Sequence, residues 1–133
     1  MSKTQNTKGL RGQTAGTTAL STVGKSGAGL TYRGYDIAEL TEKAAFEEVA
    51  HLLLKGALPN QTELDAYIAK LKSLRGLPTA LKTALEQIPA SAHPMDVMRT
   101  GCSMLGNLEP ERDFSEQHDR ADRLLAVLPS IIN

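Results

Sequence analysis

Histidine beside carboxylates is the combination in this sequence best suited to metal or acid–base chemistry. His51 follows Glu47 and Glu48 by one helical turn, a Glu-Glu-x-x-His spacing that superficially matches part of a metal site. Zinc and di-iron sites need further ligands on facing elements, and no matching pair occurs elsewhere in the chain. We therefore predict that His51 is partly buried and hydrogen-bonded, and that the protein holds no metal.

The other two histidines offer no catalytic arrangement either. His93 precedes Pro94 at a predicted helix start, where its imidazole could act in chemistry or simply accept an unpaired backbone amide. We favour the structural role. His118 lies among charged residues and is predicted to be exposed in a linker. Because no Ser-His-Asp or Cys-His arrangement can be argued, we predict no catalytic residue in this chain.

Two glycine-containing segments could bind an anion. Gly24-Lys25-Ser26 follows a strand, but a phosphate-binding P-loop needs a glycine five residues before the Gly-Lys pair, where this chain has Ala19. The segment Tyr32-Arg-Gly-Tyr-Asp36 places a guanidinium at a strand-to-helix junction, where it could bind a carboxylate or phosphate. We favour the alternative, in which Arg33 pairs locally and the tyrosines pack.

A basic edge occupies the middle of the chain, formed by Lys70, Lys72, Arg75 and Lys82. Cations near a helix C-terminus complement its dipole and are usually solvated. A contact with a ligand phosphate or carboxylate is the alternative.

Composition excludes several classes of protein. The 133 residues carry 15 basic and 15 acidic side chains, so no net charge favours nucleic acid or an anionic membrane. No apolar run reaches the roughly 20 residues that span a bilayer, and the polar N-terminus lacks a signal-peptide core. The single cysteine, Cys102, excludes an internal disulfide and favours a reducing, cytoplasmic compartment.

The N-terminal part of the chain predicts little regular structure. Residues 1–16 lack periodicity and are expected to form a flexible arm. The β-prone runs 17–23 and 30–33 flank a glycine-rich loop and predict a small hairpin.

A helical pattern follows from Asp36 onward, and we expect residues 17–133 to belong to one domain. Helices are predicted from Asp36 to Leu40, from Phe46 to Gly56, from Asn60 to Gly76, from Pro78 to Ile88, from Pro94 to about Leu105, and from near Ser115 onward. The fold class is therefore all-α with a small N-terminal hairpin. The last helix is strongly apolar (Leu124, Leu125, Val127, Leu128, Ile131 and Ile132) and needs a partner surface, so we interpret the chain as a fragment.

Five segments in order resemble the citrate synthase family. They are Gly16-Thr-Thr-Ala-Leu-Ser-Thr-Val-Gly-Lys25, Tyr32-Arg-Gly-Tyr-Asp-Ile37, Phe46-Glu-Glu-Val-Ala-His-Leu-Leu-Leu54, Leu74-Arg-Gly-Leu-Pro78 and Ala92-His-Pro-Met-Asp-Val-Met-Arg-Thr-Gly101. The resemblance covers residues 9 to about 131 and corresponds to the N-terminal part of the large domain.

The resemblance implies a helical homodimer that condenses an acyl-CoA, either propionyl-CoA or acetyl-CoA, with oxaloacetate. The family's two catalytic histidines and its aspartate belong to segments that this chain does not contain, so the chain alone is expected to be inactive. Two peripheral contacts are carried over as predictions: Arg11 near the CoA nucleotide and Lys70 as a substrate contact. A non-catalytic helical module for dimerisation or interaction is the alternative function.

Overall fold

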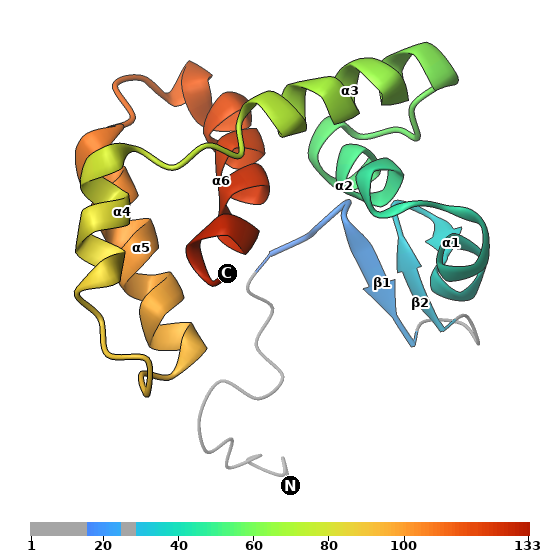
Figure 1. Cartoon of the computed structure of the whole chain (residues 1–133). Coiled ribbons are helices and arrows are strands. Elements are labelled where there is room, and N and C mark those ends of the chain that lie inside the picture. Colours follow the sequence, from blue (N-terminus) through green and yellow to red (C-terminus); the bar gives the residue numbers. More distant parts are fainter. Residues whose placement is uncertain (1–15, 25–28) are drawn as a thin grey trace, which may run out of the picture. The chain divides into compact units, whose positions relative to one another are not determined.

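The computed structural model describes residues 16–24 and 29–133. The chain divides into two compact units, Met1–Lys43 and Ala44–Asn133, and each is described by itself (Figure 1). The predicted arm, apart from Gly16, and residues 25–28 lie outside the described residues.

The first unit contains a small antiparallel sheet. Strands β1 (Ser21–Val23) and β2 (Leu30–Tyr32) form the predicted hairpin, and β3 (Tyr35–Asp36) pairs with the other side of β2. The third strand was not predicted. It forms because Arg33 and Gly34 both adopt positive φ, of 46° and 92°, which is the conformation of a tight two-residue hairpin turn.

Helix α1 (Ile37–Lys43) follows the sheet directly and packs against β2 and β3. The predicted cap is confirmed, since the Asp36 carboxylate accepts the amide of Ala38 at 2.8 Å. The helix runs three residues past its predicted end at Leu40, which is its buried residue.

The second unit is helical. It contains α2 (Phe46–Lys55), α3 (Gln61–Ser73), α4 (Thr79–Glu86), α5 (Pro94–Leu108), a 3-10 turn η1 (Phe114–Glu116) and α6 (Gln117–Ile131). The all-α prediction is therefore confirmed. In the parts of the chain that the structure covers, no helix is long and apolar enough to cross a membrane.

The helix ends follow the chemistry of the sequence. Gly56 ends α2 with a left-handed φ of 103°, and Asn60 caps α3 by accepting the amide of Glu63. Several boundaries differ from prediction. Helix α3 ends at Ser73 rather than at Gly76, and α4 ends at Glu86 rather than at Ile88. Helix α5 continues about one turn beyond Leu105, and the segment at Ser115 is a 3-10 turn capped by Asp113, so that His118 is an exposed residue of α6 rather than of a linker.

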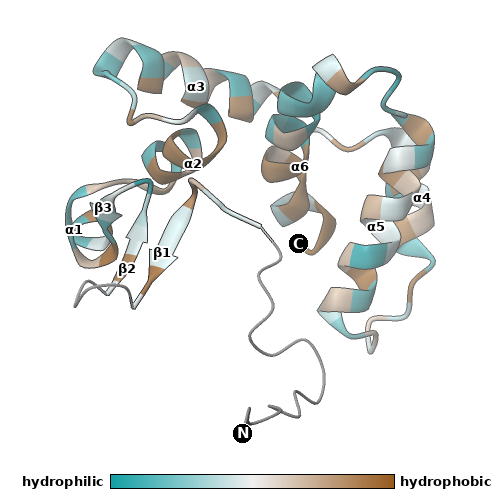
Figure 2. Cartoon of the chain, turned by 180° about the vertical axis from the view of Figure 1, so that it is seen from behind, coloured by the Kyte–Doolittle hydropathy of each residue, from teal (hydrophilic) through white to brown (hydrophobic). Residues whose placement is uncertain are grey.

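Helix α6 carries the core of this unit, and it does so on two sides. Ala126 joins Ala50, Tyr67 and Leu71 in a cluster with α2 and α3. Val127 and Ile131 join a second cluster with α4 and α5, which also contains Leu81 and Leu105. Figure 2 shows the apolar segments on these helices. Of the predicted apolar residues of α6, Leu124 and Ile132 remain exposed, at 41% and 48%.

Candidate functional site

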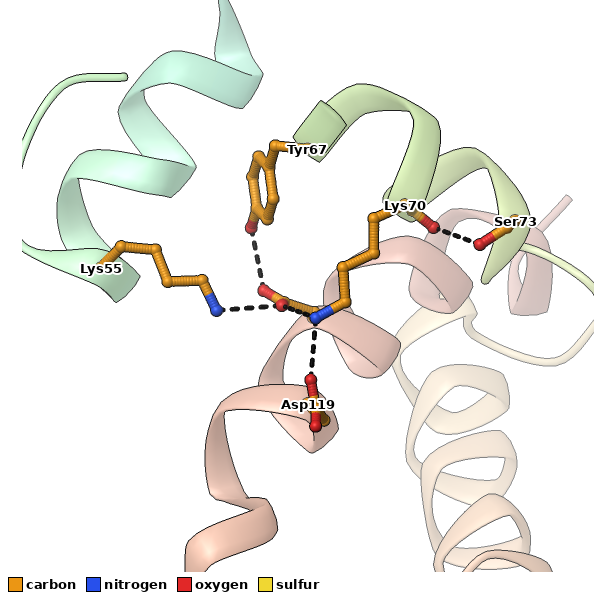
Figure 3. Close-up of polar contacts among 6 residues, drawn as sticks. Lys55, Tyr67, Lys70, Ser73 and Asp119 are labelled. Atoms are coloured by element: carbon orange, nitrogen blue, oxygen red, sulfur yellow. Dashed lines mark hydrogen bonds and ion pairs between the residues drawn. The ribbon is translucent and has the colours of Figure 1, made fainter. Parts of the chain in front are cut away.

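The most distinctive polar cluster in the described residues surrounds one buried carboxylate. Asp122 of α6 has no exposed surface. Its Oδ1 accepts the Tyr67 hydroxyl at 3.0 Å, and its Oδ2 accepts the ammonium groups of Lys55 and Lys70 at 2.9 and 2.8 Å. Figure 3 shows Lys55 of α2 and Tyr67 and Lys70 of α3 pointing toward α6. We call Asp122, Tyr67, Lys55 and Lys70 the Asp122 network.

Helix periodicity explains how the network assembles. Asp122 lies one turn before Ala126 and therefore on the stripe of α6 that faces α2 and α3. Tyr67 and Lys70 are three residues apart on α3 and share a face, while Lys55 ends α2. Lys70 also donates to Asp119 at 2.8 Å, so two carboxylates one turn apart share one cation. The network thereby ties α6 to both α2 and α3.

The electrostatics of the network keep Asp122 ionised. Burial acts to raise its pKa, but the hydrogen bonds from Lys70, Lys55 and Tyr67 outweigh burial and hold the pKa below its ordinary value. The hydrogen bonds to Asp119 and Asp122 raise the pKa of Lys70 in turn. Burial, followed by the bond to Asp122, raises the pKa of Tyr67. Both oxygens of Asp122 are occupied within the protein, so the network is suited to fixing helices rather than to exchanging protons with a substrate.

A dependence of stability on acid follows from the lowered pKa of Asp122. The folded state binds this proton less readily than the unfolded chain does, so the network stabilises the fold above the ordinary pKa of 3.8 and loses its contribution as the pH falls through the lower folded value. We expect the difference in unfolding free energy between the wild type and Asp122→Asn to shrink between about pH 5 and about pH 2. Urea denaturation at several pH values measures it, and a constant difference would contradict the assignment.

A second polar cluster centres on Arg123, the next residue of α6. Its guanidinium binds Glu109 through two hydrogen bonds, at 2.9 and 2.7 Å, and donates to the carbonyl oxygens of Leu74 and Gly76. The side chain is 14% exposed. One planar group thus joins α6, the end of α5 and the connection between α3 and α4. The bond from Arg123 also lowers the pKa of Glu109.

Arg123→Lys is expected to reduce the unfolding free energy by roughly 1 to 1.5 kcal/mol, because a lysine cannot serve a carboxylate and two carbonyl groups in one plane. Arg99→Lys is the matched control, since Arg99 is 80% exposed and pairs with Asp96 of its own helix. We expect that control to change stability by less than about 0.5 kcal/mol in urea denaturation. Equal effects of the two substitutions would contradict the role assigned to Arg123.

The structure confirms structural roles for two of the predicted histidines. The Nδ1 atom of His51 lies 2.8 Å from the carbonyl oxygen of Ala57, and its ring meets Tyr67 edge-on with centroids 5.3 Å apart. His51 is partly buried, as expected. His93 caps α5, where its Nδ1 accepts the amide of Met95 at 3.2 Å.

The predicted binding residues have different outcomes. Lys70 was expected to be solvated or to meet a ligand, but its ammonium is held by Asp119 and Asp122. The expectation of a solvated side chain holds for Lys70, Lys72, Arg75 and Lys82, all of which are exposed, but Lys70 also forms ion pairs that the sequence did not predict. Arg11 lies outside the described residues. Within the described ranges, no group of three His, Cys, Asp or Glu side chains is gathered to hold a metal ion.

Sequence reasoning missed Asp122 and Arg123 as organising residues. The available signal was positional: Asp122 occupies a place on the apolar stripe of α6, and a charge on such a stripe is buried only when it is paired. The identity of its partners, 52 and 67 residues away in the chain, required the tertiary structure.

The sequence of this chain matches a known protein family. The family model described as "Citrate synthase, C-terminal domain" matches residues 9–133. A 2-methylcitrate synthase from Shewanella oneidensis is 71% identical over 124 residues, which are 93% of this chain and 33% of that protein. A 2-methylcitrate synthase from Mycobacterium tuberculosis is 40% identical over 94% of this chain and 32% of its own length.

Solved structures agree in fold. The citrate synthase of Thermotoga maritima matches 94% of this chain with a TM-score of 0.80 and 30% identity, over 32% of its own length. The enzyme of Thermoplasma acidophilum, determined as a ternary complex with carboxymethyl coenzyme A and oxaloacetate, matches with a TM-score of 0.83 at 22% identity. The chain spans about a third of the length of these relatives. By sequence and by fold, the chain belongs to the citrate synthase family.

Proposed function

We propose that this chain is the N-terminal part of a 2-methylcitrate synthase, the enzyme that condenses propionyl-CoA with oxaloacetate in propionate breakdown. The observation that carries the proposal is the 71% identity to the Shewanella oneidensis enzyme over 93% of the chain. In this proposal the chain supplies supporting helices of the large domain. That role fits the two polar clusters, which join helices and present no free catalytic group in the described residues.

Citrate synthase, with acetyl-CoA as donor, is the second candidate. It is favoured by the 30% identity to the Thermotoga maritima citrate synthase. The two acyl donors differ by one methylene, which is worth only about 1 to 3 kcal/mol in a hydrophobic pocket. Discrimination between them is therefore a matter of relative rates.

The proposal includes a homodimer in the cytoplasm. A hollow of about 250 Å³ on α5 and α6 is lined by Cys102, Leu105, Gly106 and Leu124 among others. Leu124 is 41% exposed there, and Glu109, Glu111, Arg120 and Arg123 also line the hollow, so this face supplies apolar and charged groups for a contact between neighbouring copies. The single cysteine suits a reducing compartment. Lys70 as a substrate contact and Arg11 as a CoA contact stay predictions.

The test is reconstitution. The chain is assayed alone and after co-expression with the part of the Shewanella oneidensis enzyme outside the matched 124 residues. Loss of the thioester is followed by ultraviolet absorbance with oxaloacetate and either acyl-CoA. We expect no turnover by the chain alone and turnover by the pair, faster with propionyl-CoA.

The outcomes separate the hypotheses. Faster turnover with acetyl-CoA would assign the chain to a citrate synthase. A stable pair without turnover, together with a specific dimer of the short chain, would favour a non-catalytic helical module. Turnover by the chain alone would overturn the placement of the catalytic residues outside it, and His51 and His93 would then be the first residues to change.

A further inference from the structure

Helix α6 meets its neighbours through two contacts of different chemistry. Toward α4 and α5 the buried cluster consists only of branched aliphatic side chains: Leu81, Leu105, Val127 and Ile131. Toward α2 and α3 half of the buried cluster is alanine: Ala50, Ala126, Tyr67 and Leu71. More partly buried apolar side chains also surround the first cluster than the second. Because hydrophobic stabilisation grows with the apolar area removed from water, α4 and α5 hold α6 more firmly than α2 and α3 do.

The Asp122 network makes up the rest of the contact with α2 and α3. Asp122 is fully buried, whereas the side chains of Lys55 and Lys70 are 28% and 41% exposed. A buried ion pair gains little net free energy, because the lost hydration offsets much of the attraction between its charges. When the helices separate, water reaches all of these groups and restores that hydration. The network therefore fixes how α2 and α3 dock, while adding less stability than an apolar cluster would.

Both ends of the α2–α3 segment are marked in the structure. The chain divides into its two compact units between Lys43 and Ala44, directly before α2. After α3, the Arg123 guanidinium donates to the carbonyl oxygens of Leu74 and Gly76, which fixes the connection to α4 against α6. The segment from α2 through α3 thus lies between a boundary of the fold and an anchored connection.

We propose that α2 and α3 open from α6 as one cooperative segment while α4, α5 and α6 stay packed, and that the Asp122 network is the latch that closes this segment. Contiguous elements with few buried apolar contacts are those that open below the free energy of global unfolding. The bonds from Arg123 to Leu74 and Gly76 mark the hinge, since they hold the end of the segment while α3 leaves. Opening exposes Tyr67, Leu71 and the Asp122 carboxylate. The inference rests on contacts within the second unit and is independent of the proposed enzyme.

Hydrogen–deuterium exchange of the complete chain, read by mass spectrometry of its peptides at increasing urea concentrations, tests separate opening. Relative to intrinsic exchange rates, we expect amides of α2 and α3 to exchange at least roughly tenfold faster than those of α5 in the absence of urea. Their exchange should also depend less steeply on urea, because a partial opening exposes less surface than global unfolding does. Equal protection of α2, α3 and α5 would overturn the inference, as would different opening of α2 and α3.

Lys55→Gln tests the latch, because it removes one cation and leaves Asp122 bonded to Lys70 and Tyr67. We expect exchange in α2 and α3 to become roughly tenfold faster, since a hydrogen bond to a charged group is lost. Lys72→Gln is the matched control, because Lys72 is an exposed residue of α3 outside the network. Circular dichroism verifies that both variants are folded. Exchange that responds equally to the two substitutions, or to neither, would overturn the role of the latch.

Val97→Ala tests whether the other helices stay packed when the segment opens. Val97 of α5 packs against the cluster around Leu81 and not against the cluster that α6 shares with α2 and α3. We expect Val97→Ala to speed exchange in α4 and α5, whose amides need global unfolding, and to leave α2 and α3 as in the wild type. Equal acceleration in all four helices would show that the unit opens only as a whole and would overturn the inference.

Discussion

Asp122→Asn is expected to lower the free energy of unfolding by roughly 2 to 4 kcal/mol at neutral pH. The amide keeps the size of the side chain but loses its charge, so Lys55 and Lys70 lose their common partner. Asp122 itself has no exposed surface, and the amide offers the two ammonium groups only one neutral oxygen while its nitrogen faces the Tyr67 hydroxyl. The loss in free energy of unfolding stays below the largest losses known for broken buried ion pairs. The reason is that the side chains of Lys55 and Lys70, 28% and 41% exposed, can turn toward water.

Asp119→Asn provides the control for this prediction. Asp119 binds the same ammonium group of Lys70 at 2.8 Å but is 78% exposed, so its loss should destabilise the protein much less than the loss of Asp122 does. Urea denaturation followed by circular dichroism measures both variants. Similar losses for the two aspartates would show that burial is not what makes Asp122 important.

Gly101→Ala is expected to destabilise the second unit by roughly 1 to 3 kcal/mol, despite the better helix propensity of alanine. A methyl group on Gly101 would collide with Cγ2 of Ile131, and it would lie 3.1 and 3.3 Å from the Cδ1 and Cγ1 atoms of the same side chain. Ile131 is β-branched and buried in the cluster between α4, α5 and α6, so it cannot easily turn away. Gly101 therefore sets the close approach of α5 to α6.

Gly106→Ala is the matched control on the same helix. A methyl group there meets no atom within 4 Å, so the substitution should stabilise the protein by about 0.5 to 1 kcal/mol through helix propensity alone. The double variant Gly101→Ala with Ile131→Ala should lose less stability than the sum of its parts, because the smaller side chain leaves room for the new methyl group. Thermal melts of the wild type, the Gly106→Ala control, the two single variants at Gly101 and Ile131 and the double variant measure these effects, and a stabilising Gly101→Ala would refute the steric argument.

Local chemistry made much of the fold predictable. Gly56, Asn60 and Pro94 each act within one turn of their own position, so the ends of α2 and the starts of α3 and α5 could be placed from the sequence. The third strand escaped prediction because a two-residue segment has no periodicity, and its pairing depends on the positive φ of Arg33.

The candidate site shows where prediction from sequence stopped. His51 and His93 could be assigned structural roles because their neighbours in sequence supplied the reason. Lys70 could not, since its partners Asp119 and Asp122 lie 49 and 52 residues further along the chain. Nothing local distinguishes a lysine that pairs with a buried carboxylate from one that points into water.

The sequence by itself determined the family, the helical class and most helix boundaries, because these follow from ordered motifs, apolar periodicity and capping residues. Only the tertiary structure decided that α6 packs on two sides and that Asp122 gathers two lysines and a tyrosine. The physical reason is the distance along the chain over which each kind of interaction acts. Backbone propensities and caps act over a few residues, whereas burial and ion pairing depend on which distant helices meet.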